Sequence, residues 1–279
     1  MPLRKRMRLG GLALLAGAMV ATSVFAKDLS GLVPEKYKGA TVTVGTAATL
    51  PGVESVEPGT GRIVGVEPDL AYAVARKLGI KVEISNVAFD GLLASLQAGR
   101  YDVAMAGLAD TVQRQQAMDF VDWYVSGLRL IVPKGNPKKV SGPGNLCGLT
   151  LGGARASTQL RQMERVAKDC GAKATPLVAT DTTPAGLLLL NTGRVDVYAV
   201  DAMAAPGYVK AKPELELIAG EFFPLVRGVG FAKDNTGLRD AWQAGLKAVI
   251  DSGEYDEILK RWGMSGIAYK QATINGGKL

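Results

Sequence analysis

Short apolar runs that alternate with helix-like segments constrain the fold of this chain more than any other feature of its sequence. The run TVTVG at residues 41–45 predicts a first strand. Residues 68–78 have the apolar spacing of an amphipathic helix that ends at Gly79, and residues 80–85 predict the next strand. Regular alternation of this kind is typical of α/β domains. We therefore predict an α/β fold.

The alternation continues through the rest of the chain. Further strands are predicted at residues 102–106, 150–153, 175–179 and 195–200. Further helices are predicted at residues 89–97, 111–118, 157–170, 183–191, 203–209, 237–251 and 255–262. A chain of about 250 residues without its leader is long enough for one large domain or for two lobes.

One unit of the pattern occurs twice. Residues 96–103 (LQAGRYDV) match residues 190–197 (LNTGRVDV), and each unit ends a helix at a glycine and leads into an apolar strand. The match is either a coincidence of common helix-to-strand chemistry or a sign of two lobes of similar build, the second beginning near residue 134. Because ligands of open α/β sheets bind outside the carboxyl ends of strands, the second interpretation places Gly107 and Asp201 on facing edges of a cleft.

Residues 1–26 have the pattern of a secretory signal peptide. Four basic residues within residues 4–8 precede an uncharged, Leu/Ala-rich stretch at residues 10–22, and small residues lead to a cleavage site after Ala26. The apolar stretch is too short for a spanning helix, and a buried N-terminal helix is the alternative. We expect export to the periplasm and a soluble product, because no cysteine follows the cleavage site to carry a lipid anchor.

Loss of this leader lowers the formal net charge from +7 to about +3, which is too small and too dispersed to indicate a nucleic-acid partner. The chain contains no histidine, the commonest general base and transition-metal ligand. We therefore expect no catalytic residues, no metal, no cofactor and no enzyme activity.

Cys147 and Cys170 suit a disulfide in an exported protein, which would add about 3 kcal/mol of stability, or they are two unpaired buried thiols.

Three groups near predicted strand ends could together hold an amino acid. The guanidinium of Arg114 and the hydroxyl-bearing helix start at Ser157 and Thr158 suit a carboxylate, and Asp201 suits an ammonium group. Each also has a structural explanation: Arg114 as a surface residue, Ser157 as an N-cap, and Asp201 as the cap of the following helix. Their joint occurrence favours a binding site.

The sequence resembles the polar amino-acid-binding proteins of ABC importers, the bacterial extracellular solute-binding proteins of family 3, over about residues 42–262. The matching stretches are GTAATLPG (45–52), GVEPDLAYAVARKLG (65–79), FDGLLASLQAGRYDVAMAG (89–107), TVQRQQAMDFVDWY (111–124), GGARASTQ (152–159), TGRVDVYAVD (192–201) and RGVGFAKD (227–234). Their order and spacing make the resemblance specific.

The resemblance implies a type II periplasmic-binding-protein-like fold of two α/β lobes joined by two hinge crossovers, near residues 132–135 and 225–230. Lobe 1 would comprise residues 27–133 and 229–279, and lobe 2 residues 134–228. The protein would be a periplasmic monomer that captures an amino acid or a similar small molecule and delivers it to a membrane ABC permease.

The resemblance also implies a role for each site residue. By the family pattern, Arg114, Ser157 and Thr158 bind the ligand carboxylate, Asp201 binds its ammonium, Gly107 makes a backbone contact, Phe89 packs on the ligand side chain, and Ala109 stands where a Ser or Thr near the carboxylate is usual. The placement of Cys147 and Cys170 is similar to that in a subgroup with a disulfide in lobe 2.

The chain departs from the family at the side-chain pocket. Ala47 replaces the usual Asp, Leu50 replaces a stacking aromatic residue, and Gly52–Val53 replaces Pro-Phe. Basic amino acids are therefore less expected as ligands. Glu67 and Asp110 either add negative charge near the cleft or lie at the surface.

Two other functions fit a fold of this kind. A periplasmic dehydratase of the cyclohexadienyl type would need a general acid, for which Glu67, Asp110 and Glu221 are the candidates; the missing histidine and the retained Asp201 disfavour it. A separate sensory ligand-binding protein is the other alternative.

Overall fold

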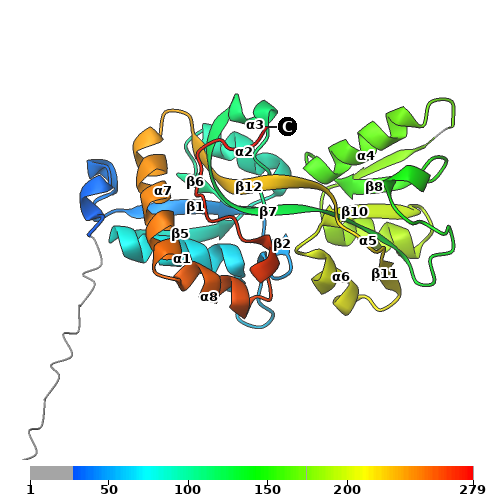
Figure 1. Ribbon diagram of the computed structural model, residues 1–279, viewed down its shortest axis with the longest axis horizontal. Coiled ribbons are helices and arrows are strands. Elements are labelled where there is room, and N and C mark those ends of the chain that lie inside the picture. The colour runs from blue at the N-terminus through cyan, green and yellow to red at the C-terminus, as the bar shows by residue number, and fades with distance from the viewer. Residues whose placement is uncertain (1–27, 174, 279) are drawn as a thin grey trace, which may run out of the picture.

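The structure is a computed structural model that describes residues 28–173 and 175–278. Its main feature is a mixed β-sheet with the strand order β5–β1–β6–β12–β7–β10–β8–β9, and the short strand β11 pairs with β7 (Figure 1). A small separate sheet contains β2, β3 and β4. The expected signal peptide lies outside the described residues. Among the described residues, no helix is both long enough and apolar enough to cross a membrane.

The elements follow one another along the chain much as the alternation predicts. The strands are β1 (Thr41–Thr46), β2 (Thr49–Leu50), β3 (Glu54–Val56), β4 (Ile63–Val64), β5 (Lys81–Asn86), β6 (Val103–Ala104), β7 (Met118–Pro133), β8 (Leu151–Ala154), β9 (Leu177–Thr180), β10 (Val197–Asp201), β11 (Leu215–Leu217) and β12 (Phe222–Ala232). The α-helices are α1 (Val66–Leu78), α2 (Phe89–Gln97), α3 (Val112–Gln115), α4 (Thr158–Asp169), α5 (Thr183–Asn191), α6 (Ala205–Ala211), α7 (Thr236–Asp251) and α8 (Glu254–Arg261).

The sheet has two parallel parts with a pair of long antiparallel strands between them. In the first half-sheet, β1 pairs in parallel with β5 and β6; in the second half-sheet, β8 pairs in parallel with β9 and β10. Strand β7 is antiparallel to both β12 and β10. Figure 1 shows β7 and β12 running side by side between the two half-sheets. The two parts of the chain are therefore connected through continuous strands.

Strand β7 leaves the first half-sheet and joins the second near its middle. Ser126 pairs with Leu225 of β12, whereas Leu128 pairs with Asp201 of β10. Gly127 lies between them, and a Cβ atom there would lie 2.4 Å from the carbonyl oxygen of Phe222. The close approach of β7 and β12 therefore requires a glycine. Val132, in the first hinge region that the resemblance places at residues 132–135, pairs with Glu216 of β11.

Helices cover both half-sheets and bury their apolar faces. Helices α1, α7 and α8 lie beside the first half-sheet, and α4, α5 and α6 lie beside the second (Figure 1). Helix α1 buries Leu70, Val74 and Leu78, and it ends at Gly79, whose φ of 66° is left-handed. Helices α1 and α7 pack closely because Gly245 of α7 lies against Val74 and Leu78. Burial of each such aliphatic side chain stabilises the fold by about 1.5–3 kcal/mol.

The predicted α/β pattern is confirmed, with two kinds of error. Helices α2 and α5 have the predicted bounds, but the helix predicted at residues 111–118 ends at Gln115, because Met118 already belongs to β7. The long strands β7 and β12 were not predicted. Strand β7 carries the buried acidic residues Asp119 and Asp122, which interrupt its apolar run. Their partners come from later in the chain: Thr273 donates to Asp122, and Asn275, Lys233 and Arg239 donate to Asp119.

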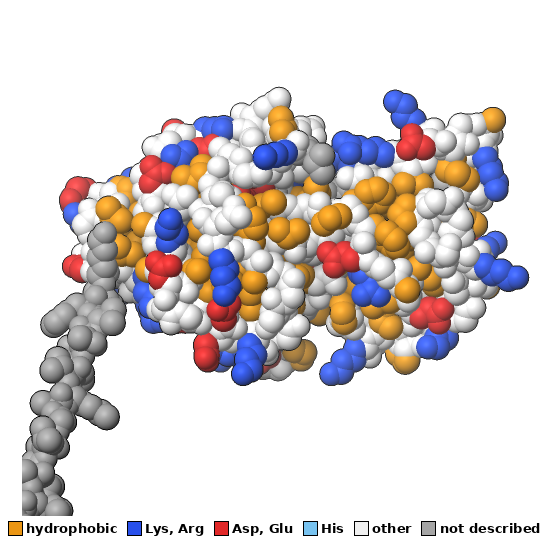
Figure 2. All heavy atoms as spheres, in the orientation of Figure 1, with side chains coloured by type: hydrophobic (Ala, Val, Ile, Leu, Met, Phe, Trp, Pro, Cys, Tyr) orange, Lys and Arg blue, Asp and Glu red, His pale blue; other side chains and the backbone are white. Residues whose placement is uncertain are grey.

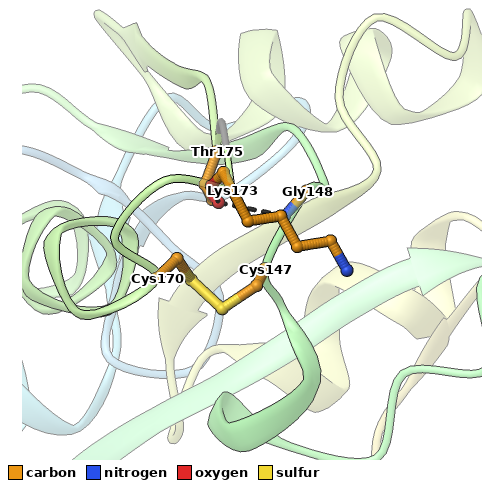
Figure 3. The surroundings of a disulfide bond; sticks show 5 residues. All are labelled: Cys147, Gly148, Cys170, Lys173 and Thr175. Carbon is orange, nitrogen blue, oxygen red and sulfur yellow. Dashed lines mark hydrogen bonds between the residues drawn. A yellow bond between two sulfur atoms is a disulfide. The ribbon is translucent and has the colours of Figure 1, made fainter.

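A disulfide joins Cys147 to Cys170, with 5.3 Å between the Cα atoms (Figure 3). It ties the segment before β8 to the end of α4, beside a hydrogen bond from the amide of Gly148 to Thr175. The alternative of two unpaired thiols is therefore excluded.

On the face drawn in Figure 2, basic side chains are scattered among acidic ones rather than gathered into a patch.

Candidate functional site

A cavity lies at the carboxyl ends of parallel strands from both half-sheets. Ala106 and Gly107 follow β6 on one side, and Ala154 and Asp201 end β8 and β10 on the other. This is the position that open α/β sheets use for ligands. Most of the predicted ligand-binding residues are among its lining residues, namely Phe89, Gly107, Arg114, Ser157, Thr158 and Asp201. The sequence therefore predicted residues that the fold brings to one cavity.

Arg114 reaches across the cavity from the short helix α3. The hydroxyl of Thr111 caps this helix by accepting a hydrogen bond from the amide of Arg114. The guanidinium donates to the carbonyl oxygens of Ala109 at 3.0 Å and Ala156 at 3.3 Å. Burial, with the nearby charges of Arg161 and Arg227, lowers the pKa of Arg114 to about 9, so it keeps its charge at neutral pH. Arg114 is therefore a buried cation and not the surface residue of the alternative interpretation.

Ala109 is not among the cavity-lining residues. It is buried, and its carbonyl oxygen positions the guanidinium of Arg114. Its predicted place among the ligand-binding residues stays a prediction.

The start of α4 faces the same cavity. The hydroxyl of Ser157 accepts a hydrogen bond from the amide of Leu160 at 3.1 Å, so Ser157 is an N-cap as well as a lining residue. Thr158 is the first residue of the helix. The partial positive charge of a helix N-terminus favours an anion, and the guanidinium of Arg114 adds a full charge beside it. This end of the cavity suits a carboxylate.

Asp201, at the end of β10, already has partners within the protein. Its Oδ2 atom lies 2.8 Å from Nη2 of Arg227, and its Oδ1 atom accepts from the amide of Met203 at 2.9 Å. Weaker contacts come from the hydroxyl of Ser126 at 3.4 Å and the amide of Gln159 at 3.5 Å. Burial raises the pKa of Asp201, while the charge of Arg227 opposes that shift.

Arg227 is a lining residue that sequence reasoning did not assign. It lies on β12 and donates to the carbonyl oxygens of Gly107 at 2.6 Å and Ser126 at 3.1 Å, besides its ion pair with Asp201. Its only sequence signal was its place at the start of the stretch RGVGFAKD. The partners of Arg227 lie far away in the sequence, so its role could not be inferred from local pattern.

Two buried glutamates lie beneath the same end of the cavity. Glu54 lines the cavity, and neither of its carboxyl oxygens has a hydrogen-bond partner among the described residues. Glu67 accepts hydrogen bonds from the amide of Gly107 at 3.2 and 3.3 Å. Burial and the neighbouring Glu67 carboxyl raise the pKa of Glu54 well above its usual range, and burial raises the pKa of Glu67 to about 7.

The candidate general acids of the dehydratase hypothesis are not among the cavity-lining residues. Glu67 binds the backbone behind Gly107. Asp110 accepts from the side chain of Gln115 and from the amide of Gly277. The carboxylate of Glu221 accepts from the backbone amide of Gly127 at 2.5 Å. Each of these three acids therefore has a structural partner, and that of Glu67 is the amide of the lining residue Gly107.

The sequence of the chain was compared with those of known proteins and protein families. The model of the bacterial extracellular solute-binding proteins, family 3, matches residues 42–265. The chain is similar to the L-cystine-binding protein TcyJ of Escherichia coli strain K12, at 28% identity over 90% of this chain and 91% of the relative. It is 25% identical to the arginine-binding protein ArgT of Corynebacterium glutamicum, over 89% of this chain and 83% of that protein.

Solved structures of amino-acid-binding proteins also resemble this chain. The structure of an ancestral arginine-binding protein bound to arginine is similar, with a TM-score of 0.74 and 34% identity, and the match covers 80% of this chain and 97% of the other.

Proposed function

The chain belongs to the bacterial extracellular solute-binding proteins, family 3, and from this premise we propose that its cavity binds a small carboxylate, an amino acid or an amino-acid-like molecule. The fold is that of the type II periplasmic binding proteins. The function of the family is solute capture for ABC importers. The identity of the ligand must be inferred from the geometry of this chain's own cavity.

The proposal rests on the contact between Arg114 and the turn that leads into α4. The guanidinium donates to Ala109 on its own side and to Ala156 on the far side of the cavity. A ligand carboxylate bound here would contact Arg114 together with the hydroxyls of Ser157 and Thr158. Because these groups come from both half-sheets, the ligand would favour the arrangement in which the halves are closed.

We propose the two lobes as the moving parts, with residues 27–133 and 229–279 in one lobe and residues 134–228 in the other. The strands β7 and β12 are the connections about which such a movement would occur. A pair of continuous strands allows a small rotation without breaking the pairing within either half-sheet.

The proposed location is the periplasm, with a membrane ABC permease as partner and a monomeric protein as the carrier. The signal-peptide pattern at residues 1–26 and the disulfide between Cys147 and Cys170 both support an oxidising compartment. We further propose that the protein binds its ligand without converting it, because none of the candidate general acids Glu67, Asp110 and Glu221 is among the cavity-lining residues.

A thermal-shift panel tests this function. The protein from residue 27 onward, with its disulfide intact, is heated with each proteinogenic L-amino acid and with the matching 2-hydroxy and 2-oxo acids. At least one compound should raise the melting temperature in proportion to the logarithm of its concentration. Absence of stabilisation by every member of this panel would contradict the proposal.

A further inference from the structure

One buried cation already contacts two groups that the resemblance assigns to the ligand. The guanidinium of Arg227 donates through Nη1 to the carbonyl oxygen of Gly107 at 2.6 Å. Its Nη2 atom lies 2.8 Å from Oδ2 of Asp201. Gly107 and Asp201 are the backbone contact and the carboxylate that the resemblance assigns to the ligand. Arg227 therefore lies where the ammonium of an amino acid would have to bind.

Arg227 is held from several sides. Its Nε atom donates to the carbonyl oxygen of Ser126 at 3.1 Å, and Nη2 also donates to that of Gly127 at 3.4 Å. The side chain is 3% exposed, so displacing it would leave a buried cation without its acceptors. An ammonium placed beside it would instead meet a like charge in a poorly solvated site. Both routes weaken the binding of an amino acid.

Other charges at the cavity do not offset this effect. Glu54 also lines the cavity, but burial and the adjacent Glu67 carboxyl raise the pKa of Glu54 well above its usual range, which favours its neutral form. The charge of Asp201 is matched by Arg227. Tyr124 lies in the same buried region, and burial, with the neighbouring carboxylates, raises its pKa, so it is neutral. Asp181 also lines the cavity and pairs with Arg155, whereas the guanidinium of Arg114 has only carbonyl acceptors among the described residues.

We propose that the ligand is a 2-hydroxy or 2-oxo carboxylic acid rather than a 2-amino acid, with its carboxylate at Arg114 and its C2 oxygen beside Arg227. This inference rests on the proposed solute-binding function. Of the five N–H bonds of the Arg227 guanidinium, one on Nη1 has no acceptor among the described residues. An oxo group accepts a hydrogen bond from it, and a hydroxyl accepts one and can donate to Asp201.

One wall of the cavity is apolar and indicates the kind of side chain. Ala47, Leu50, Phe89 and Ala106 form this wall, while polar residues line another part of the cavity, namely Thr49, Gln159, Asp181, Thr182 and Thr183. The φ of Gly107 is 57°, and a Cβ there would lie 3.0 Å from Leu50, so the apolar wall lies directly against the strand end. An apolar side chain on the ligand fits this wall.

Calorimetric titration of the wild-type protein with matched acids tests the inference. L-Leucine is compared with its 2-hydroxy and 2-oxo analogues, and L-alanine, L-methionine and L-phenylalanine are compared with theirs; the remaining L-amino acids complete the panel. A hydroxy or oxo acid should bind about tenfold more tightly, or better, than its amino acid.

Each outcome decides between the two proposals. Binding of any L-amino acid as tightly as the best hydroxy or oxo acid overturns this inference and leaves the solute-binding function intact. Failure of all these compounds to bind overturns both.

Variants of Arg227 give a second readout, the ratio of amino-acid to hydroxy-acid affinity. Arg227→Gln removes the cation and should shift this ratio toward the amino acid by about tenfold or more, whereas Arg227→Lys keeps the charge and should preserve the preference. Arg62→Gln at an exposed position serves as the matched control and should leave the ratio unchanged. An unchanged ratio in a folded Arg227→Gln protein contradicts the inference; if that variant does not fold, the wild-type titrations decide alone.

Discussion

The guanidinium of Arg114 on α3 donates to the carbonyl oxygen of Ala156, 3.3 Å away in the turn before α4. Ala156 has a φ of 61°, a conformation that non-glycine residues adopt rarely. This turn directs its carbonyl group toward the other half of the molecule. The contact links the first half-sheet to the second at the end of the cavity that suits a carboxylate.

Replacing Arg114 should weaken ligand binding. Arg114→Lys keeps a positive charge but loses the planar, two-pronged geometry that matches a carboxylate. A hydrogen bond to a charged group is worth about 1.5–3 kcal/mol, so affinity should fall by about tenfold or more. The measurement is the melting-temperature increase caused by the compound that stabilises the wild-type protein. Arg62→Lys, at an exposed position, is the control, and an equal response of Arg114→Lys and wild type would exclude a role for Arg114 in binding.

Removing the carboxylate of Asp201 should destabilise the fold in the absence of any ligand. Asp201→Asn leaves the buried guanidinium of Arg227 without its counter-charge, and breaking a buried pair on one side costs about 3–5 kcal/mol. Adding Arg227→Gln to this variant removes the unpaired cation and should recover part of the loss. Urea unfolding of the two single variants and the double variant measures the coupling. Additive losses would show that the pair makes no energetic contribution as a unit.

Reduction of the disulfide should lower the free energy of unfolding. Cys147 and Cys170 are separated by 23 positions, and closing a loop of this size stabilises a protein by about 3 kcal/mol in the chain-entropy description. Urea unfolding with and without dithiothreitol measures the loss. A variant with serine at both positions should have the lower stability from the start and should not respond to the reductant. A response in that variant would mean that the reductant acts elsewhere.

The stability of the protein should depend on pH through Glu67. Burial raises its pKa from 4.5 in the unfolded chain to about 7 in the folded protein. Between these values the unfolded chain releases the Glu67 proton before the folded protein does, so the free energy of unfolding falls as the pH rises from 4.5 to about 7. Asp122, whose pKa burial also raises to about 7, contributes a decline of the same sign.

Glu67→Gln removes this contribution, together with the effect of Glu67 on the pKa of Glu54, while Asp122 remains in both proteins. The stability of the variant relative to wild type should increase over that pH range by about 1.4 kcal/mol for each unit of the pKa difference. Urea unfolding at a series of pH values gives the comparison, with the exposed Glu83→Gln as control. Parallel profiles for Glu67→Gln and wild type would show that Glu67 titrates normally in the folded protein.

Periodicity and strand-end rules were enough to predict the α/β fold and to bring most of the site together. The helices at residues 89–97 and 183–191 have clear apolar spacing and glycine-containing stops, so their bounds were correct. Arg114 and Asp201 could be placed near one cavity because the carboxyl ends of parallel strands share an edge of the sheet. These inferences depend only on local sequence and one topological rule.

The remaining features depend on contacts between distant segments. Strand β7 was missed because Asp119 and Asp122 are buried against partners near the end of the chain. Arg227 was missed because its acceptors are Gly107, Ser126, Gly127 and Asp201, which only the folded sheet brings together. A charged residue in an apolar strand gives no indication of its partners before the topology is known.

Everything from β8 to β11 lies between β7 and β12 in the sequence. The second half-sheet is thus a single uninterrupted insert, while the elements around the first half-sheet come from two separate stretches of chain. A gene segment bounded within these two long strands could be exchanged as a cassette with that of a relative, bringing one wall of the cavity with it. The opposite graft, of the other wall, would use the same two junctions but would have to exchange two separate stretches of chain.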